Sequence, residues 1–215
     1  LDVSFLSTTP EAIMYVPSYS DWLEKTDQSP AYEYTVKLLK LLQWQRPADR
    51  WVLKTPHHLE FLDLAQKYFW DVQFIWTHRD VHEAIPSFLS MVAHSRILFS
   101  NDVDANEVAR HWVRKIGYML SRAMDYRLKN TRDNHITDVL YKDLVGDSMS
   151  VTKRIYSNQN LEISPELQKI FNATEKSNPR RKYGFHKYAH GDFGIDRDFI
   201  DKFTLPYQMF QKTLK

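Results

Sequence analysis

The sequence predicts an α/β fold, in which a parallel sheet is flanked by helices. Short apolar runs bounded by Pro or charged residues predict buried strands over 51–54, 72–77 and 137–141. Longer segments with an apolar residue every three or four positions predict helices between and after these runs. Strands that alternate with helices form parallel sheets, and 215 residues are enough to enclose one core. We therefore expect a single domain over 1–215 with a helix-rich carboxyl-terminal part.

The expected helices follow from start signals and amphipathic patterns. Ser29-Pro30 precedes a helix over 31–44, and Asp102 or Asp104 caps a long helix over 106–129. The other helices are expected over 57–69, 81–98, 148–157, 164–174 and 196–212. The apolar face of the first helix contains Tyr34, Leu38, Leu41 and Leu42. The basic residues of the long helix are interpreted as its solvated face: Arg110, Arg114, Lys115, Arg122 and Arg127.

The composition excludes several classes of protein. A net charge of +2 argues against a general binder of nucleic acid or of membrane surfaces. The chain contains no Cys, so disulfides and thiolate metal sites are excluded. No apolar run approaches the ~18 residues that span a bilayer, and no signal peptide is visible, so we expect a cytoplasmic protein. The glycine-rich phosphate loops G-x-x-x-x-G-K-[ST] and G-x-G-x-x-G are also absent from the sequence.

A cluster of basic and hydroxyl side chains follows the first expected strand. Lys54, His57 and His58 surround Pro56, which is well suited to begin a helix. Helix N-termini favour anions because their amide hydrogens are unpaired and the helix dipole is positive there. A Lys and a His at this place can hold a phosphoryl or sulfuryl group and take a proton from a nucleophile. The alternative is a Lys at a strand end beside two surface His residues that cap a helix.

A second cluster follows the next expected strand. Arg79 comes directly after an apolar run, where a cation is unusual unless it meets an anion. Ser87, about two turns into the following helix, can share that anion. The alternative is a structural ion pair of Arg79 with Asp80 or Asp71. Because ligands bind at the carboxyl ends of parallel strands, the two clusters together predict a site for a multiply charged anion.

These motifs resemble those of the sulfotransferases that depend on 3′-phosphoadenosine-5′-phosphosulfate. The bacterial-type branch of that family carries W-x-L-K-[ST]-P-x-H-L and T-H-R-D-P, which read WVLKTPHHL over 51–59 and THRDV over 77–81 here. The resemblance continues through 139–144 and 178–188 and so covers nearly the whole chain. It implies a parallel sheet like that of P-loop NTPases. It also implies that the N-terminal strand and the phosphosulfate-binding loop of the family are missing from these residues, so we expect these residues alone to be inactive.

The resemblance implies a role for each motif residue. Arg79 and Ser87 match the pair that binds the 3′-phosphate of the donor, and Tyr141 matches a tyrosine against the adenine. His58 matches the catalytic base, with His57 as a neighbour that stays open as an alternative. Lys54 matches a lysine near the transferring sulfuryl group.

Arg181 and Lys182 are similar to an element that closes over the 3′-phosphate, although one residue is inserted here. A metal is not expected: His78 and His82 have a zinc-like spacing, but no third ligand is indicated.

The resemblance implies a sulfotransferase that moves a sulfuryl group from this co-substrate to a hydroxyl or amine. The acceptor is a small molecule, a carbohydrate or a lipid; the sequence does not choose among them and leaves the oligomeric state open. Two other functions remain possible on the sequence alone. One is a kinase-like, nucleotide-dependent transferase of the P-loop class, and the other is an inactive interaction domain with the same fold.

Overall fold

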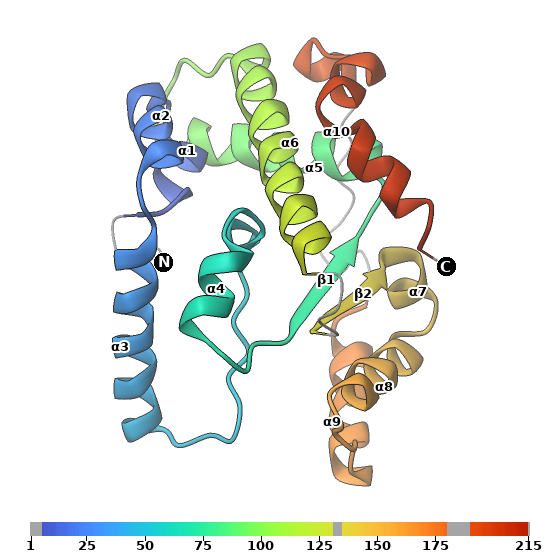
Figure 1. Cartoon of the computed structure of the whole chain (residues 1–215). Helices are drawn as coiled ribbons and strands as arrows, with labels where there is room; N and C mark the ends of the chain where they lie inside the picture. Colours follow the sequence, from blue (N-terminus) through green and yellow to red (C-terminus); the bar gives the residue numbers. More distant parts are fainter. Residues whose placement is uncertain (1–5, 131–134, 180–189, 215) are drawn as a thin grey trace.

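The structure, a computed structural model, describes residues 6–130, 135–179 and 190–214. The N-terminal helices come first in the chain and lie on one side of the molecule (Figure 1). They are α1 (Thr9–Ile13), α2 (Pro17–Lys25) and α3 (Ser29–Gln45). The central elements are η2 (Pro56–Glu60), α4 (Leu62–Tyr68), β1 (Phe74–His78), α5 (Val81–Ile97), α6 (Ala105–Lys129) and β2 (Ile136–Leu140). The remaining elements are α7 (Tyr141–Gly146), α8 (Ser148–Asn158), α9 (Pro165–Ser177), η3 (His190–Phe193) and α10 (Arg197–Gln211).

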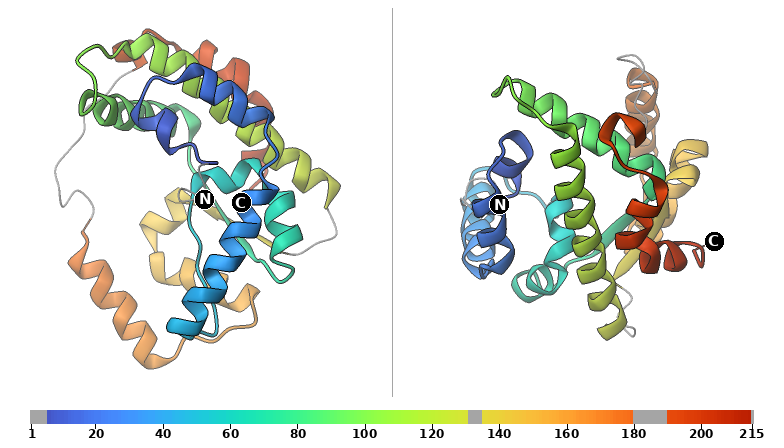
Figure 2. Two further views of the ribbon diagram at one scale, coloured as in Figure 1. Left: turned by 90° about the vertical axis from the view of Figure 1, so that its left-hand side faces the viewer. Right: turned by 90° about the horizontal axis from the view of Figure 1, so that it is seen from above.

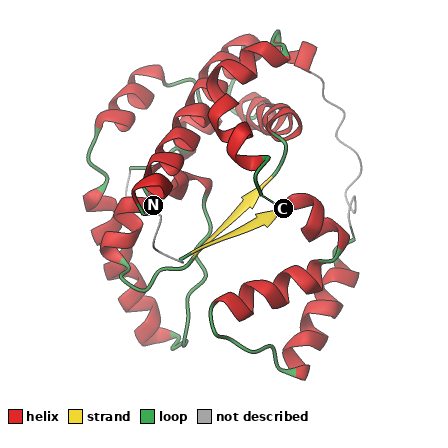
Figure 3. Cartoon of the chain, turned by 45° about the vertical axis from the view of Figure 1, so that its right-hand side comes forward, coloured by secondary structure: helices red, strands yellow, loops and turns green. Residues whose placement is uncertain are grey.

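A small parallel sheet lies among the helices. In the described residues, β1 and β2 pair in parallel from Phe74↔Ile136 to His78↔Leu140. The two strands point in the same direction, and helices surround them (Figure 3). The predicted strands over 72–77 and 137–141 are therefore confirmed within one or two residues, as is the parallel α/β arrangement.

The predicted strand over 51–54 is wrong. This segment is an unpaired stretch between α3 and η2. Val52 is 90% exposed, and the side chains of Trp51 and Leu53 are about two fifths exposed. A strand needs a neighbour for its backbone hydrogen bonds. In the described part of the chain no strand pairs with this segment, so its apolar residues alone do not produce a strand.

Helix α6 is the centre of the core. Its first turn is capped by Asp104, whose side chain accepts a hydrogen bond from the backbone N–H of Asn106. The helix packs against α5, α10, α4 and η2 (Figure 2). Its buried stripe repeats every three or four residues, and it contacts the apolar faces of α5 and α10. Buried residues of this core include Leu89, Val92, Val108, Trp112, Val113, Leu120 and Ile200.

Two helices differ from their expected form. The helix expected over 57–69 is split at Phe61 into the 3-10 helix η2 and the α-helix α4. Helix α3 buries Ala31 and Tyr32, whereas Tyr34 and Leu41 are exposed. The side that α3 buries is set by its contact with α4, which cannot be read from the period of α3 alone.

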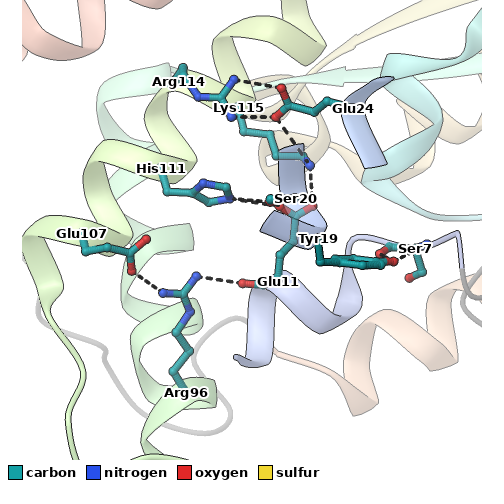
Figure 4. Close-up of polar contacts among 10 residues, drawn as sticks. All are labelled: Ser7, Glu11, Tyr19, Ser20, Glu24, Arg96, Glu107, His111, Arg114 and Lys115. Atoms are coloured by element: carbon teal, nitrogen blue, oxygen red, sulfur yellow. Dashed lines mark hydrogen bonds and ion pairs between the residues drawn. The ribbon is translucent and has the colours of Figure 1, made fainter. Parts of the chain in front are cut away.

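The interpretation of the basic residues of α6 as a solvated face is wrong in part. Lys115 is fully buried and forms an ion pair with Glu11 of α1 (Figure 4). Glu11 also accepts hydrogen bonds from Ser20 and from Nε2 of His111. Burial alone would raise the pKa of Glu11, but the hydrogen bond from His111 and the charge of Lys115 outweigh it and hold the pKa below its usual value.

A second ion pair joins α2 to the same face of α6. Arg114 donates two hydrogen bonds to Glu24, at 2.6 and 3.0 Å (Figure 4). Lys115 and Arg114 therefore anchor the N-terminal helices, whereas Arg110 is exposed as expected.

Candidate functional site

Arg79 and Tyr141 lie together at the carboxyl ends of the two strands. The last register pair of the sheet is His78↔Leu140, and Arg79 and Tyr141 are the next residues of their chains. The guanidinium carbon of Arg79 lies 4.8 Å from the centre of the Tyr141 ring. A cation over an aromatic face at this distance is an attractive contact. The structure thus joins a charged group and an aromatic plane at the edge where parallel sheets bind ligands.

The guanidinium of Arg79 is only loosely held by protein groups. Its Nε lies 3.3 Å from Oε2 of Glu83, one turn along α5. The Arg79 side chain is 33% exposed and that of Glu83 is 62% exposed, so water screens this pair strongly. The pairing considered from the sequence, with Asp80 or Asp71, is wrong: Asp80 instead caps α5 by accepting from the N–H of His82, 2.8 Å away. An anion that binds Arg79 therefore has to displace only the weakly bound carboxylate of Glu83.

Ser87 lies in the second turn of α5 and is half-buried. It is on the helix that begins beside Arg79, but the two side chains, both within the described residues, are not hydrogen-bonded to each other. Their joint contact with one phosphate stays a prediction.

His57 and His58 take different positions at the start of η2. The Thr55 hydroxyl caps this turn by accepting from the N–H of His57, 3.4 Å away. The side chain of His57 is buried at 3% exposure, with its ring edge-on to Phe61. His58 is half-buried, and its Nδ1 lies 2.8 Å from the hydroxyl of Tyr32. Of the two adjacent rings, His57 is buried and His58 keeps access to solvent.

Burial lowers the pKa of His58 to about 4. Removal of a ring from water disfavours its charged form, so His58 is neutral at physiological pH. A neutral imidazole has one nitrogen with a free lone pair, which is what a general base requires.

Lys54 is in the unpaired segment before η2 and is exposed. In the described part of the chain it makes no hydrogen bond or ion pair, and its approach to the sheet edge stays a prediction. Arg181 and Lys182 lie outside the described residues.

Glu60 was not singled out from the sequence. It ends η2, is 3% exposed, and its Oε2 has no hydrogen-bond partner among the residues that the structure describes. Burial raises the pKa of Glu60 to about 7, although Lys115 and Arg122 act in the opposite direction. Glu60 lines a hollow of about 290 Å³ together with Arg122. The available signal was an acid inside an apolar run, Leu59 to Leu62, because an acid is rarely buried without a partner.

The His pair with zinc-like spacing has other partners. His78 is buried, with Nδ1 2.9 Å from the Tyr207 hydroxyl and Nε2 2.9 Å from Asp138. His82 pairs with Asp201 at 2.9 Å. These contacts join α10 to β1 and α5, and β1 to β2. Among the residues described, no three His, Asp or Glu side chains are grouped as a metal site would require.

In the same residues, no helix is both long and apolar enough to cross a membrane.

Comparisons with known proteins identify the family of this chain. Residues 1–165 match the profile of the sulfotransferase family. The fold resembles the crystal structure of sulfotransferase STF9 from Mycobacterium avium, with a TM-score of 0.87 and 23% identity over 95% of this chain and 53% of that one. It also resembles sulfotransferase STF1 from Mycobacterium tuberculosis H37Rv, with a TM-score of 0.79 and 27% identity over 91% of this chain and 50% of that one.

The chain spans about half the length of these two structures. No curated protein matches it. The family profile covers most of the sequence, and the two structures share its helix-rich α/β fold. The chain therefore belongs to the sulfotransferase family.

Proposed function

We propose that this protein transfers a sulfuryl group from 3′-phosphoadenosine-5′-phosphosulfate to a hydroxyl or amine acceptor, on a sheet related to that of P-loop NTPases. The observation that carries the proposal is the contact of Arg79 with the Tyr141 ring at the ends of two in-register strands. A nucleotide with an extra phosphate needs both a cation and an aromatic plane. The planar fork of Arg suits a phosphate better than Lys does.

In this proposal, Arg79 and Ser87 hold the 3′-phosphate, and Tyr141 lies against the adenine. Arg181 and Lys182 close over the same phosphate. The weak hold of Glu83 on the guanidinium supports this role, because an exposed ion pair contributes at most about 1 kcal/mol and yields to a doubly charged phosphate. Recognition requires no metal ion, since the positive charge comes from side chains.

The proposed reaction is an in-line displacement with His58 as the base. The acceptor oxygen forms a bond to sulfur while its proton moves to a ring nitrogen of His58. The bond between sulfur and the phosphate oxygen breaks, and its electron pair stays on that oxygen, which leaves 3′-phosphoadenosine-5′-phosphate. We assign Lys54 to stabilise the charge on the leaving oxygen. Burial lowers the pKa of His58 to about 4, so the ring is neutral at neutral pH and keeps a lone pair for the proton.

Nucleotide affinity tests the proposal. Calorimetry on the full-length protein should show that 3′-phosphoadenosine-5′-phosphate binds on the order of 100-fold more tightly than AMP, because a charged group that loses its partner costs about 2–5 kcal/mol. Arg79→Ala should remove most of that difference. Arg110→Ala is the matched control, since Arg110 is a 63% exposed arginine on α6. Equal affinity for the two nucleotides in the wild-type protein would contradict the assignment.

The acceptor class is tested separately, with the labelled phosphosulfate donor and panels of phenols, sugars and amines. Membership of the sulfotransferase family favours this function over phosphoryl transfer and over an inactive interaction domain. Transfer of phosphate from ATP in place of sulfate from the donor would reverse that preference.

A further inference from the structure

We propose that Tyr32 is a positioning residue that holds His58 in the tautomer with a proton on Nδ1, so that Nε2 is the nitrogen that accepts the proton of the acceptor. The inference rests on the proposed function in one respect, the use of His58 as the base. Tyr32 is 26 residues away in the sequence and belongs to α3 rather than to the motif of η2.

The contact itself is short and well defined. The hydroxyl oxygen of Tyr32 lies 2.8 Å from Nδ1 of His58, a normal length for a hydrogen bond with an imidazole nitrogen. The same oxygen lies 3.4 Å from the carbonyl oxygen of Phe61. Tyr32 therefore bridges the ring of His58 and the backbone at the end of η2.

The two contacts together select the direction of the hydrogen bonds. A phenol has one proton to donate, and burial raises the pKa of Tyr32, so this proton stays on the hydroxyl. If Tyr32 donates to the Phe61 carbonyl, it accepts from Nδ1–H of His58, and both contacts are hydrogen bonds. If it donates to Nδ1 instead, the Phe61 carbonyl keeps only the hydrogen bond from the N–H of Ala65, 2.9 Å away, and the 3.4 Å contact is a van der Waals contact. The first arrangement is the one that makes a hydrogen bond of both Tyr32 contacts, and the inference rests on it.

The position of the hydroxyl is fixed by packing. Tyr32 has no exposed surface, and its core cluster includes Phe61 and Ala65. Its ring stacks on Tyr68 at 6.1 Å between centres and is tilted against Phe69. A ring held on several sides cannot follow a rotation of His58, so the hydroxyl acts as a fixed reference for the imidazole.

The consequence for His58 is a free lone pair on the opposite nitrogen. In the part of the chain that the structure describes, Nε2 of His58 has no hydrogen-bond partner, whereas Nδ1 has one. A partner on one ring nitrogen decides which nitrogen carries the proton, and thereby which one can act as a base. Tyr32 touches neither reactant in this scheme and acts through His58 alone.

Tyr32→Phe is the test, with Tyr68→Phe as the matched control. Both changes remove one phenol oxygen from the same aromatic cluster, but the Tyr68 hydroxyl bonds to Glu33 and not to His58. In the full-length protein at neutral pH, nitrogen NMR of labelled His should show Nδ1 of His58 protonated in the wild type and in Tyr68→Phe. Tyr32→Phe should show a mixture of tautomers.

The kinetic result should separate the two variants as well. With saturating donor, kcat of Tyr32→Phe should fall by about 10- to 100-fold, less than the 10²–10⁴-fold that a positioned base contributes. The affinity for 3′-phosphoadenosine-5′-phosphate should stay within twofold of wild type. Tyr68→Phe should keep both values.

Two results would overturn the role of Tyr32. One is a wild-type spectrum with the proton of His58 on Nε2. This measurement does not depend on the folding of any variant. The other is equal kcat in the two phenylalanine variants of an active protein. A wild-type protein that binds the nucleotide but transfers no sulfuryl group would instead overturn the proposed function itself.

Discussion

Lys115 of α6 and Glu11 of α1 form an ion pair from which water is excluded, with both side chains almost fully buried. They are separated by 104 residues in the sequence. The pair joins the first helix of the fold to its central helix (Figure 4). Glu11 is also bonded by Ser20 and His111, so its charge is met from three directions.

Lys115→Met should destabilise the protein by about 3–5 kcal/mol, because it leaves Glu11 as a buried charge without its main partner. The double variant Lys115→Met, Glu11→Gln should recover a large part of this loss, since a neutral amide can keep bonds to Ser20 and His111. Urea unfolding measures both values. Arg110→Ala, on the exposed side of α6, should change stability by less than about 0.5 kcal/mol. A single variant as stable as wild type would show that the pair contributes nothing.

His58 and Glu60 should give opposite dependences of stability on pH. Burial lowers the pKa of His58 from 6.5 to about 4. As pH falls from about 6.5 to 4, the unfolded chain therefore takes up a proton that the folded chain does not, and stability is lost. Burial raises the pKa of Glu60 from 4.5 to about 7, so its contribution is complete below pH 4.5 and is lost as pH rises toward 7. The two effects offset each other in the wild type.

Each effect should reach at most about 3 kcal/mol, since a tenfold change in proton affinity corresponds to about 1.4 kcal/mol. In His58→Asn only the effect of Glu60 remains, so the stability of this variant relative to wild type should decrease as pH rises from 4.5 to 7. In Glu60→Gln only the effect of His58 remains, so the relative stability of that variant should increase over the same range. Chemical unfolding across this range measures both. If both variants keep the wild-type dependence of stability on pH, the shifted pKa values of His58 and Glu60 are contradicted.

Glu83→Gln should raise the affinity for 3′-phosphoadenosine-5′-phosphate by about two- to fivefold. The change removes the carboxylate that holds Arg79 in the free protein, and an exposed pair of this kind contributes at most about 1 kcal/mol. Calorimetry at low salt is the measurement. Glu166→Gln, at the exposed start of α9, is the control. Glu107 is not suitable because it pairs with the buried Arg96. An unchanged or weaker affinity in Glu83→Gln would indicate that Arg79 does not meet the anion.

His58→Ala should lower single-turnover sulfuryl transfer by about 10²–10⁴-fold and leave nucleotide affinity nearly intact, because the base contacts the acceptor and not the 3′-phosphate. His57→Ala should lower stability instead, since it removes a buried ring that packs edge-on against Phe61. Rapid-quench kinetics and thermal unfolding on both variants separate the two effects. Loss of transfer in a stable His57→Ala protein would exchange the roles of the two residues.

Much of the local structure and the family could be predicted from the sequence. The apolar runs before His78 and Tyr141 predicted two parallel strands, and the period of the long helix and its cap at Asp104 predicted α6. These features depend on residues close together in the chain. The motifs around Lys54 and Arg79 likewise indicated a sulfotransferase, because each is a short continuous segment.

Only the tertiary structure decided which side chains meet. The residues of 51–54 have the composition of a strand but no neighbour to pair with in the described chain. Lys115 has the spacing of a solvated residue but is buried because α1 brings Glu11 onto it. Tyr32 is bonded to His58 because α3 and η2 pack on the same cluster. Such contacts join residues from 26 to 104 positions apart, and the free energy of burying a charge or a ring depends on a partner that no local pattern reveals.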